Sequence, residues 1–224
     1  MARLESLASR ELRAWAPMLR DALAPRFGDE ASPLLDAIGA RLKQLLADLP
    51  DPGWRAPAMR RFSLGGALYI AVYLELAARG LSAADAWAIC EAATKQRFAA
   101  MAGFERKLAS AGMFSWLMKA MSRWFAKQTR TAPRGDWVVE FVEAKDGFAY
   151  GVNYHRCAIF ELAKRHGAAA FAPYICLSDI VGSEAFGWGL VRQETLAQGG
   201  ARCDFRFRRE GATEVKVRLP IVSG

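Results

Sequence analysis

Hydrophobic positions in the first 130 residues recur at the spacing of amphipathic helices. Apolar side chains three to four residues apart predict helices over residues 4–27, 32–49, 63–80, 82–101 and 104–127. Ser82 and Asp85 have the spacing of a capping pair at the start of the fourth helix. Pro50, Pro52 and Gly53 end the second helix, because proline disfavours helical backbone at and before itself. The N-terminal part of the chain is therefore expected to be helical.

After residue 136, the period of the hydrophobic pattern changes to two residues, as in a β-strand. Alternating or β-rich segments predict strands over residues 137–143, 147–153, 189–197, 201–208 and 213–220, and two short helices over 154–166 and 173–186. We therefore expect an α+β protein, with an N-terminal helical half (1–132) packed on a C-terminal antiparallel sheet (137–224) that has two helices on one face. The two regions are expected to form one compact unit.

Composition and charge indicate which kinds of molecule the protein binds. The 224 residues are 53% hydrophobic and carry a net charge of +8, with basic residues placed among acidic ones along the chain. We expect a small-molecule substrate and no nucleic acid, leave a homodimer open, and do not expect a membrane partner. Glu75 and Arg79 interrupt the most apolar stretch, and no export signal is found. The expected location is the cytoplasm.

Three of the four cysteines lie in the last third of the sequence, each in a different expected element. Without paired spacing or an export signal, Cys157, Cys176 and Cys203 are expected to be reduced thiols. Cys203 alternates with Phe205 and Phe207, so its thiol should point to the buried sheet face. That position fits either a small core residue or a wall of a site.

A carboxylate accompanies two of these thiols. Asp179 lies three residues after Cys176, and Glu161 lies four residues after Cys157, so each pair shares one face of its expected helix. If both faces turn inward, thiols and carboxylates converge, with His155 as the nearest base in sequence. An exposed helix carboxylate is the other interpretation of Asp179. The 18 and 26 residues between successive thiols match no compact zinc spacing, so neither a metal nor a cofactor is expected.

Two polar residues have two interpretations each. Asn153 either caps the helix that follows it or contacts a ligand. Thr195 ends a strand before Gly199 and Gly200, which are expected to form a hairpin turn, and Thr195 or Glu194 must face inward. An inward hydroxyl needs a partner, and a bound ligand is one such partner.

The segment 113–130 combines Met and Trp residues with basic side chains. Packing on the other helices is the favoured interpretation. A lid over an apolar site and a helix lying on a membrane surface remain as alternatives.

Three segments together resemble a known family. They are "GVNYHRC" with Asn153 and Cys157, "YICLSD" with Cys176 and Asp179, and "VRQETLAQGGARCDFRF" with Arg192, Thr195 and Cys203. In order and spacing they are similar to the L-2-amino-thiazoline-4-carboxylic acid hydrolase family. Residues 68–87 also look like the helical hairpin of these proteins.

The resemblance implies hydrolytic opening of a small cyclic C=N substrate of the 2-amino-thiazoline-4-carboxylate type, giving an N-carbamoyl-cysteine. The candidate catalytic residues are Cys176, Asp179 and Cys157, and the candidate substrate-binding residues are Asn153, His155, Arg192, Thr195 and Cys203. Either a Cys176 thiolate adds to the substrate, or Asp179 acts as a base on water. A non-catalytic ligand-binding protein similar to the vinyl-reductase-type domain, and an enzyme for a larger hydrophobic substrate, are the alternatives.

Overall fold

The computed structural model describes residues 2–51, 57–132 and 136–216. Packing divides the chain into two compact units: unit 1 contains Met1–Arg97 and Leu162–Ile175, and unit 2 contains Phe98–Glu161 and Cys176–Gly224. The division into regions 1–132 and 137–224 that the sequence pattern favours stays a prediction. Within the described part of the chain, no helix is long and apolar enough to cross a membrane.

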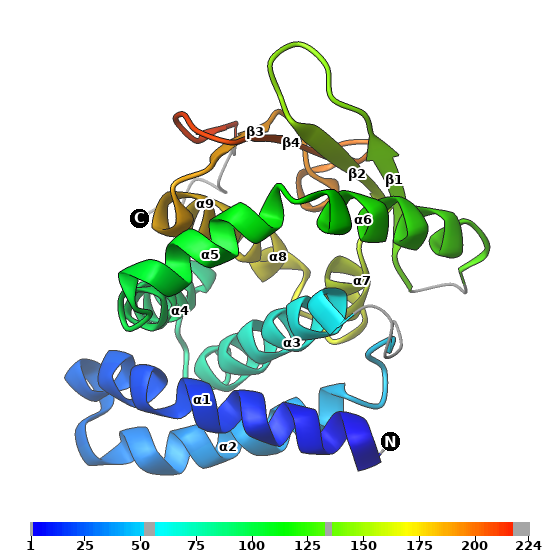
Figure 1. Cartoon of the computed structure of the whole chain (residues 1–224). Coiled ribbons are helices and arrows are strands. Elements are labelled where there is room, and N and C mark those ends of the chain that lie inside the picture. Colours follow the sequence, from blue (N-terminus) through cyan, green and yellow to red (C-terminus); the bar gives the residue numbers. More distant parts are fainter. Residues whose placement is uncertain (1, 52–56, 133–135, 217–224) are drawn as a thin grey trace. The chain divides into compact units, whose positions relative to one another are not determined.

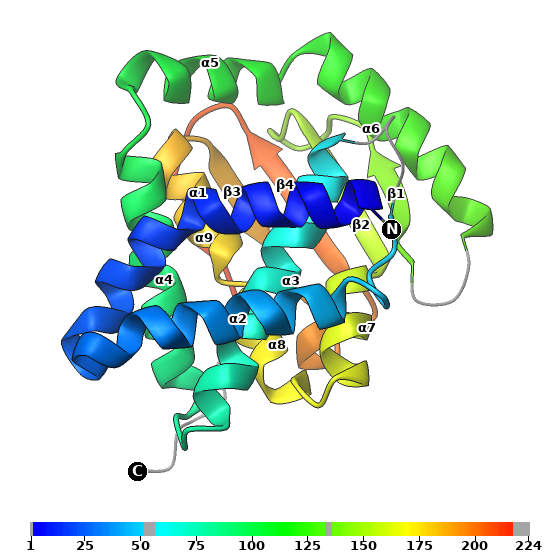
Figure 2. The same cartoon turned by 90° about the horizontal axis from the view of Figure 1, so that it is seen from below.

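Unit 1 is built from helices. It contains α1 (Ala2–Phe27), α2 (Ala31–Leu45), α3 (Pro57–Ala77), most of α4 (Ala83–Ala99) and the short α8 (Ala172–Ile175). Helices α1 and α2 lie side by side (Figure 2), and their apolar stripes meet in a core that includes the fully buried Leu23, Ile38 and Leu45. For α1 and α2, the helical spacing in the sequence therefore identified the buried faces correctly.

The ends of these helices follow from local chemistry. Ser82 Oγ accepts a hydrogen bond from the Asp85 backbone N at 3.1 Å, and Asp85 Oδ2 accepts one from the Ser82 backbone N at 3.1 Å. This reciprocal pair confirms the expected cap at the start of α4. The expected start of α3 at Ser63 was wrong, since that helix already includes Pro57, a residue tolerated in a first turn.

The single helix expected over residues 104–127 is two helices in the structure. They are α5 (Gly103–Met113) and α6 (Trp116–Gln128). Ser115 separates them: its Oγ accepts from the Met118 backbone N at 3.1 Å and donates to the Gly112 carbonyl at 2.7 Å. Serine is a strong helix N-cap, so the second helix starts afresh at Trp116.

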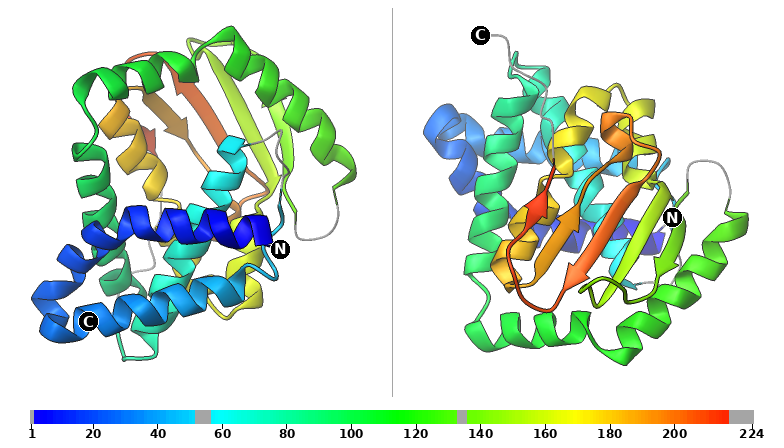
Figure 3. Two further views of the ribbon diagram at one scale, coloured as in Figure 1. Left: turned by 60° about the horizontal axis from the view of Figure 1, so that its bottom comes forward. Right: turned by 90° about the horizontal axis from the view of Figure 1, so that it is seen from above.

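The sheet of unit 2 contains β1 (Val138–Val142), β2 (Tyr150–Arg156), β3 (Gly189–Arg192), β4 (Cys203–Arg208) and β5 (Glu214–Val215), in the order β1-β2-β4-β3-β5. Figure 3 (right) shows this order across the sheet. The first four strands are antiparallel to their neighbours, as expected. The β5 strand is parallel to β3, because the chain reverses after β4 and pairs on the far side of β3.

Register places the strand residues on two distinct faces. On one face, here called the inner face, Val152 lies opposite Phe205 and Tyr154 lies opposite Cys203. Leu190, Cys203 and Phe205 form a buried cluster on this face, which confirms the alternation of the 201–208 segment. The helix α9 (Ser178–Phe186) packs against β3, with α5 beside it (Figure 1).

Two expected helices begin or end differently in the structure. The segment 154–156 belongs to β2, where Arg156 pairs with Val138, and α7 (Ala158–Arg165) begins only after Cys157. The helix expected over 173–186 is interrupted at Cys176 and Leu177. The Cys176 carbonyl accepts a hydrogen bond from Arg192 Nη2 at 2.9 Å. In a continuous helix this carbonyl would instead accept from a backbone N–H of the next turn.

Candidate functional site

Arg192 occupies the centre of a buried polar cluster on the inner face of unit 2. Its side chain is 1% exposed, and its guanidinium lies 5.1 Å from the centre of the Phe205 ring. Nη1 donates to Asp179 Oδ2 at 2.5 Å, and Nη2 donates to the Cys176 carbonyl. Among the described residues, Nε has no hydrogen-bond partner. A buried donor without a partner suits an incoming acceptor such as a carboxylate.

Asp179 lies in the first turn of α9, facing Arg192. Burial raises the pKa of its carboxyl group above the ordinary value, and the neighbouring Arg192 charge and hydrogen bond oppose that rise. A carboxylate with a raised pKa is a better base at neutral pH than an exposed one. The interpretation of Asp179 as an exposed helix carboxylate is therefore wrong, because only 17% of its side chain is exposed.

The three C-terminal thiols gather around this ion pair. The thiols of Cys157 and Cys203 and the Asp179 carboxylate each raise the pKa of Cys176, which places these groups in one electrostatic neighbourhood. Burial is the main cause of a raised pKa at each thiol: about 12 at Cys157, about 11 at Cys203 and well above the ordinary value at Cys176. All three thiols are therefore protonated at neutral pH.

Local hydrogen bonds position Cys203 and Cys157. The Leu196 backbone N donates to Cys203 Sγ at 3.3 Å. Cys157 lies between β2 and α7, and its carbonyl accepts from the Glu161 backbone N at 3.0 Å, so it begins the helix rather than lying within it. The fourth cysteine, Cys90, is buried in α4 of unit 1.

Tyr154 belongs to this cluster, although sequence reasoning did not identify it. It lies opposite Cys203 in the β2–β4 pairing and packs edge-on against Phe205 and Trp137, with ring centres 5.3 and 5.4 Å apart. Burial raises the pKa of its phenol, and the neighbouring Asp179 carboxylate raises it further. In the sequence, the alternation of Tyr154 with Val152 indicates that both side chains lie on the same face of a strand. We missed this pattern because residue 154 was assigned to the start of a helix.

Asn153 and His155 lie on the opposite face of the sheet, here called the outer face. Asn153 donates from Nδ2 to Glu140 Oε2 at 2.8 Å and accepts at Oδ1 from Arg206 Nη1 at 2.9 Å. His155 Nε2 lies 2.9 Å from the same Glu140 oxygen. The expected helix-capping role of Asn153 is wrong, because the residue lies inside β2. The structure does not bring these two residues to Cys176 and Asp179.

Thr195 is buried at the start of a short 3-10 turn, Leu196–Gln198, and lies after the end of β3. Its Oγ1 donates to Gln198 Oε1 at 3.3 Å, which supplies the partner that an inward hydroxyl requires. The connection from β3 to β4 is longer than the expected diglycine hairpin. Asp204 Oδ1 fixes this connection by accepting from the backbone N of Gln193 and of Glu194 at 2.9 and 2.8 Å.

Within the described residues, no group of three or more His, Cys, Asp or Glu side chains is arranged to hold a metal ion. The cluster therefore offers an ion pair, three neutral thiols and a phenol. In chemical terms it can bind an anion at Arg192 and move a proton at Asp179.

Comparison with known protein families gives a match over most of the chain. A family model described as L-2-amino-thiazoline-4-carboxylic acid hydrolase matches residues 61–207, about two thirds of the chain. The matched range contains every residue of the inner-face cluster, and it extends upstream over α4 and over α3 from Arg61 onward. Neither the curated proteins nor the solved structures include a match to the chain.

Proposed function

The chain belongs to the L-2-amino-thiazoline-4-carboxylic acid hydrolase family, and from this membership we propose that it hydrolyses a small cyclic C=N substrate of the 2-amino-thiazoline-4-carboxylate type. The observation that carries the proposal is the buried Arg192–Asp179 pair in unit 2, surrounded by three thiols. Such a pair combines an anion-binding group with a base inside a largely apolar environment, where each interacts strongly with a bound substrate.

Arg192 binds the substrate carboxylate in this proposal. Its Nε is buried without a partner among the described residues, while Nη1 and Nη2 are engaged by Asp179 and Cys176. A carboxylate that accepts from Nε satisfies the orphaned donor and brings the thiazoline ring against Phe205, which already stacks with the guanidinium. The ring then lies on the side of the sheet that carries Asp179.

Asp179 acts as the base. It takes a proton from water as the water oxygen bonds to the C=N carbon, and this proton passes to the ring nitrogen. Asp179 then takes the hydroxyl proton of the tetrahedral adduct, a carbonyl forms, and the C–S bond breaks. The leaving sulfur receives that proton, and the product is an N-carbamoyl-cysteine with a free thiol.

The protonation of the thiols favours water over cysteine as the nucleophile. Burial raises the pKa of Cys176 well above its ordinary value, so the thiolate that covalent catalysis needs is scarce at neutral pH. Cys157, Cys176 and Cys203 instead form a neutral wall around the reacting ring. This arrangement favours Asp179 over Cys176 as the group that starts the reaction.

Turnover of 2-amino-thiazoline-4-carboxylate by the purified protein tests the proposal, with the new thiol of the product as the readout. We expect Asp179→Asn to lower kcat at least about 100-fold, and Arg192→Lys chiefly to raise KM. Cys176→Ala retains turnover if water attacks, and a loss as large as that of Asp179→Asn assigns the attack to Cys176. Glu140→Gln, on the outer face, is the control and leaves both constants unchanged.

Two results would contradict the proposal. Full activity of Asp179→Asn removes the carboxylate from the reaction. A wild-type protein that binds the thiazoline without consuming it identifies a ligand-binding protein. Thermal unfolding of each variant, recorded beside the kinetics, separates lost chemistry from lost folding.

A further inference from the structure

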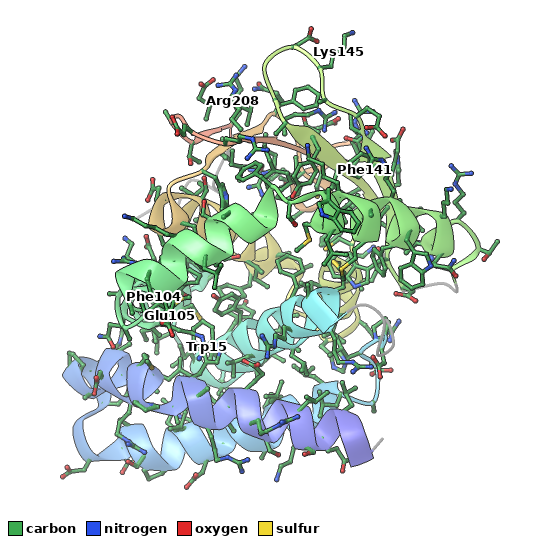
Figure 4. All side chains as sticks on the ribbon, in the orientation of Figure 1. Trp15, Phe104, Glu105, Phe141, Lys145 and Arg208 are labelled. Atoms are coloured by element: carbon green, nitrogen blue, oxygen red, sulfur yellow. The ribbon has the colours of Figure 1, made fainter. Side chains whose placement is uncertain are left out.

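Helices α5 and α6 of unit 2 expose large apolar side chains to solvent. Phe104 and Leu108 on α5 are each 70% exposed, and Trp116 and Leu117 at the start of α6 are 79% and 53% exposed. Phe104 lies in the first turn of α5 (Figure 4), and Leu108 follows four residues later on the same helix face. An isolated exposed leucine is ordinary, whereas four large apolar side chains on two consecutive helices indicate a binding surface.

The same two helices carry a net positive charge. Helices α5 and α6 contain five lysines and arginines and one acidic residue, Glu105, in a chain whose net charge is +8. Arg123 pairs with Glu143 of the following hairpin, at 2.6 Å between Nη2 and Oε2. Lys107, Lys127 and Arg130 are exposed. Lys107 belongs to α5 and Lys127 to the last turn of α6, so each helix combines exposed basic and exposed apolar side chains, which is the composition of a helix that lies on an anionic surface.

We propose that this α5–α6 surface, formed by Phe104, Lys107, Leu108, Trp116, Leu117 and Lys127, docks on an anionic lipid bilayer. The apolar side chains enter the boundary between headgroups and acyl chains, and the basic side chains stay at the level of the anionic headgroups. Trp116 suits that boundary because its ring is apolar and its indole N–H can still donate a hydrogen bond.

Charge distinguishes a bilayer from a second copy of the chain. In a two-fold dimer the same patch occurs on both sides of the interface, so the basic residues of one copy would face those of the other. Like charges across an interface oppose association, whereas anionic headgroups attract every one of them. The bilayer is therefore the occupant that the composition of this surface fits. The proposal is independent of the hydrolytic function, because none of these side chains belongs to the Arg192 cluster.

Co-sedimentation of the full chain with vesicles tests the proposal. We expect binding to vesicles that contain phosphatidylglycerol, little binding to vesicles of phosphatidylcholine alone, and a steep decrease in binding as salt is added. The double variant Trp116→Ser with Leu117→Ser loses at least about tenfold in affinity, since it removes apolar area from the interface. Lys107→Glu with Lys127→Glu loses binding to the anionic vesicles.

Matched substitutions elsewhere serve as controls. Phe62→Ser removes an exposed aromatic side chain of α3, and Lys43→Glu reverses an exposed charge of α2, and neither changes vesicle binding. Equal binding to neutral and anionic vesicles, or wild-type binding by the Trp116 and Leu117 double variant, overturns the proposal. Sedimentation velocity without lipid gives a further outcome: a dimer that the double variant abolishes identifies a second copy as the occupant and also overturns the proposal.

Discussion

Arg192 Nη1 and Asp179 Oδ2 lie 2.5 Å apart, in a pair whose arginine side chain is 1% exposed. Removing one partner of a buried pair leaves the other charge without compensation. We therefore expect Asp179→Leu to lower the free energy of unfolding by about 3 kcal/mol. The double variant Asp179→Leu with Arg192→Met removes both charges and recovers most of that loss. Urea denaturation of Asp179→Leu, Arg192→Met and the double variant measures the loss of unfolding free energy in each. If the loss in the double variant equalled the sum of the losses in the two single variants, the result would contradict an ion pair.

The same carboxyl group makes stability depend on pH. Burial raises the pKa of Asp179 in the folded protein, whereas an unfolded aspartate titrates at about 3.9. The folded state therefore holds more protons in the interval above that value, and its free energy of unfolding decreases as pH rises through the folded pKa. Asp179→Asn removes this decrease. If the difference in unfolding free energy between the wild type and the Asp179→Asn variant stayed constant from about pH 4 upward, the carboxyl group would not be perturbed.

Thiol reactivity tests the protonation of the cluster. With its pKa raised to about 11, the Cys203 thiol is about 100-fold less ionised at neutral pH than a thiol of pKa 9.0. We expect Cys157, Cys176 and Cys203 to react slowly with a thiol reagent in the native protein and rapidly after unfolding in urea. Mass spectrometry of the labelled peptides locates each reaction. A fast native reaction at Cys176 would instead favour the thiolate mechanism.

Side-chain periodicity predicted most of the buried surfaces in this chain. The helical stripes of α1 and α2 and the alternation of Cys203 and Phe205 are buried as expected, since each depends only on the geometry of its own element. The family match agrees with the resemblance seen in the C-terminal segments and in the helical hairpin at residues 68–87, and it covers the chain between them as well.

Long-range contacts account for what the sequence pattern did not predict. Arg192 donates a hydrogen bond to the Cys176 carbonyl, where the expected helix is interrupted. Pairing with β1 extends β2 as far as Arg156. Both contacts join residues that are far apart in the sequence, so no local sequence pattern predicts them. Both also change the conformation of residues in the candidate site. Assigning Tyr154 to a helix therefore concealed its position in the cluster, and the same error made Asn153 look like a helix cap.

Asn153 and His155 provide a matched pair of substitutions on the outer face. Asn153 is 4% exposed and bridges Glu140 and Arg206, so Asn153→Ala is expected to cost about 2 kcal/mol by leaving buried polar groups unpaired. His155 shares Glu140 but has an exposed side chain, and His155→Ala is expected to cost at most about 0.5 kcal/mol. Chemical denaturation measures both. Once corrected for the fraction of folded protein, the KM of each variant for a thiazoline substrate should equal that of the wild type. A raised KM in a fully folded variant would show that the residue contributes to substrate binding.

Gly151 occupies a point of close approach between β2 and β4. A Cβ at this position would lie 2.6 Å from the Phe205 carbonyl oxygen and 2.8 Å from Arg206 Cδ. The carbonyl belongs to the strand backbone and cannot yield without disturbing the pairing that holds Cys203 opposite Tyr154. We expect Gly151→Ala to lower the free energy of unfolding by about 2 kcal/mol.

The control for Gly151 is Gly65, inside α3, where a Cβ would meet no atom within 4 Å. Gly65→Ala is expected to raise the free energy of unfolding by up to about 1 kcal/mol, because alanine loses less backbone entropy in a helix. Opposite signs for the two glycine substitutions, measured in one denaturation series, would confirm that close strand contact causes the loss at Gly151. If Gly151→Ala were neutral, β2 and β4 could separate locally, and the inner-face cluster would then depend on α9 and Arg192 rather than on the strand pairing.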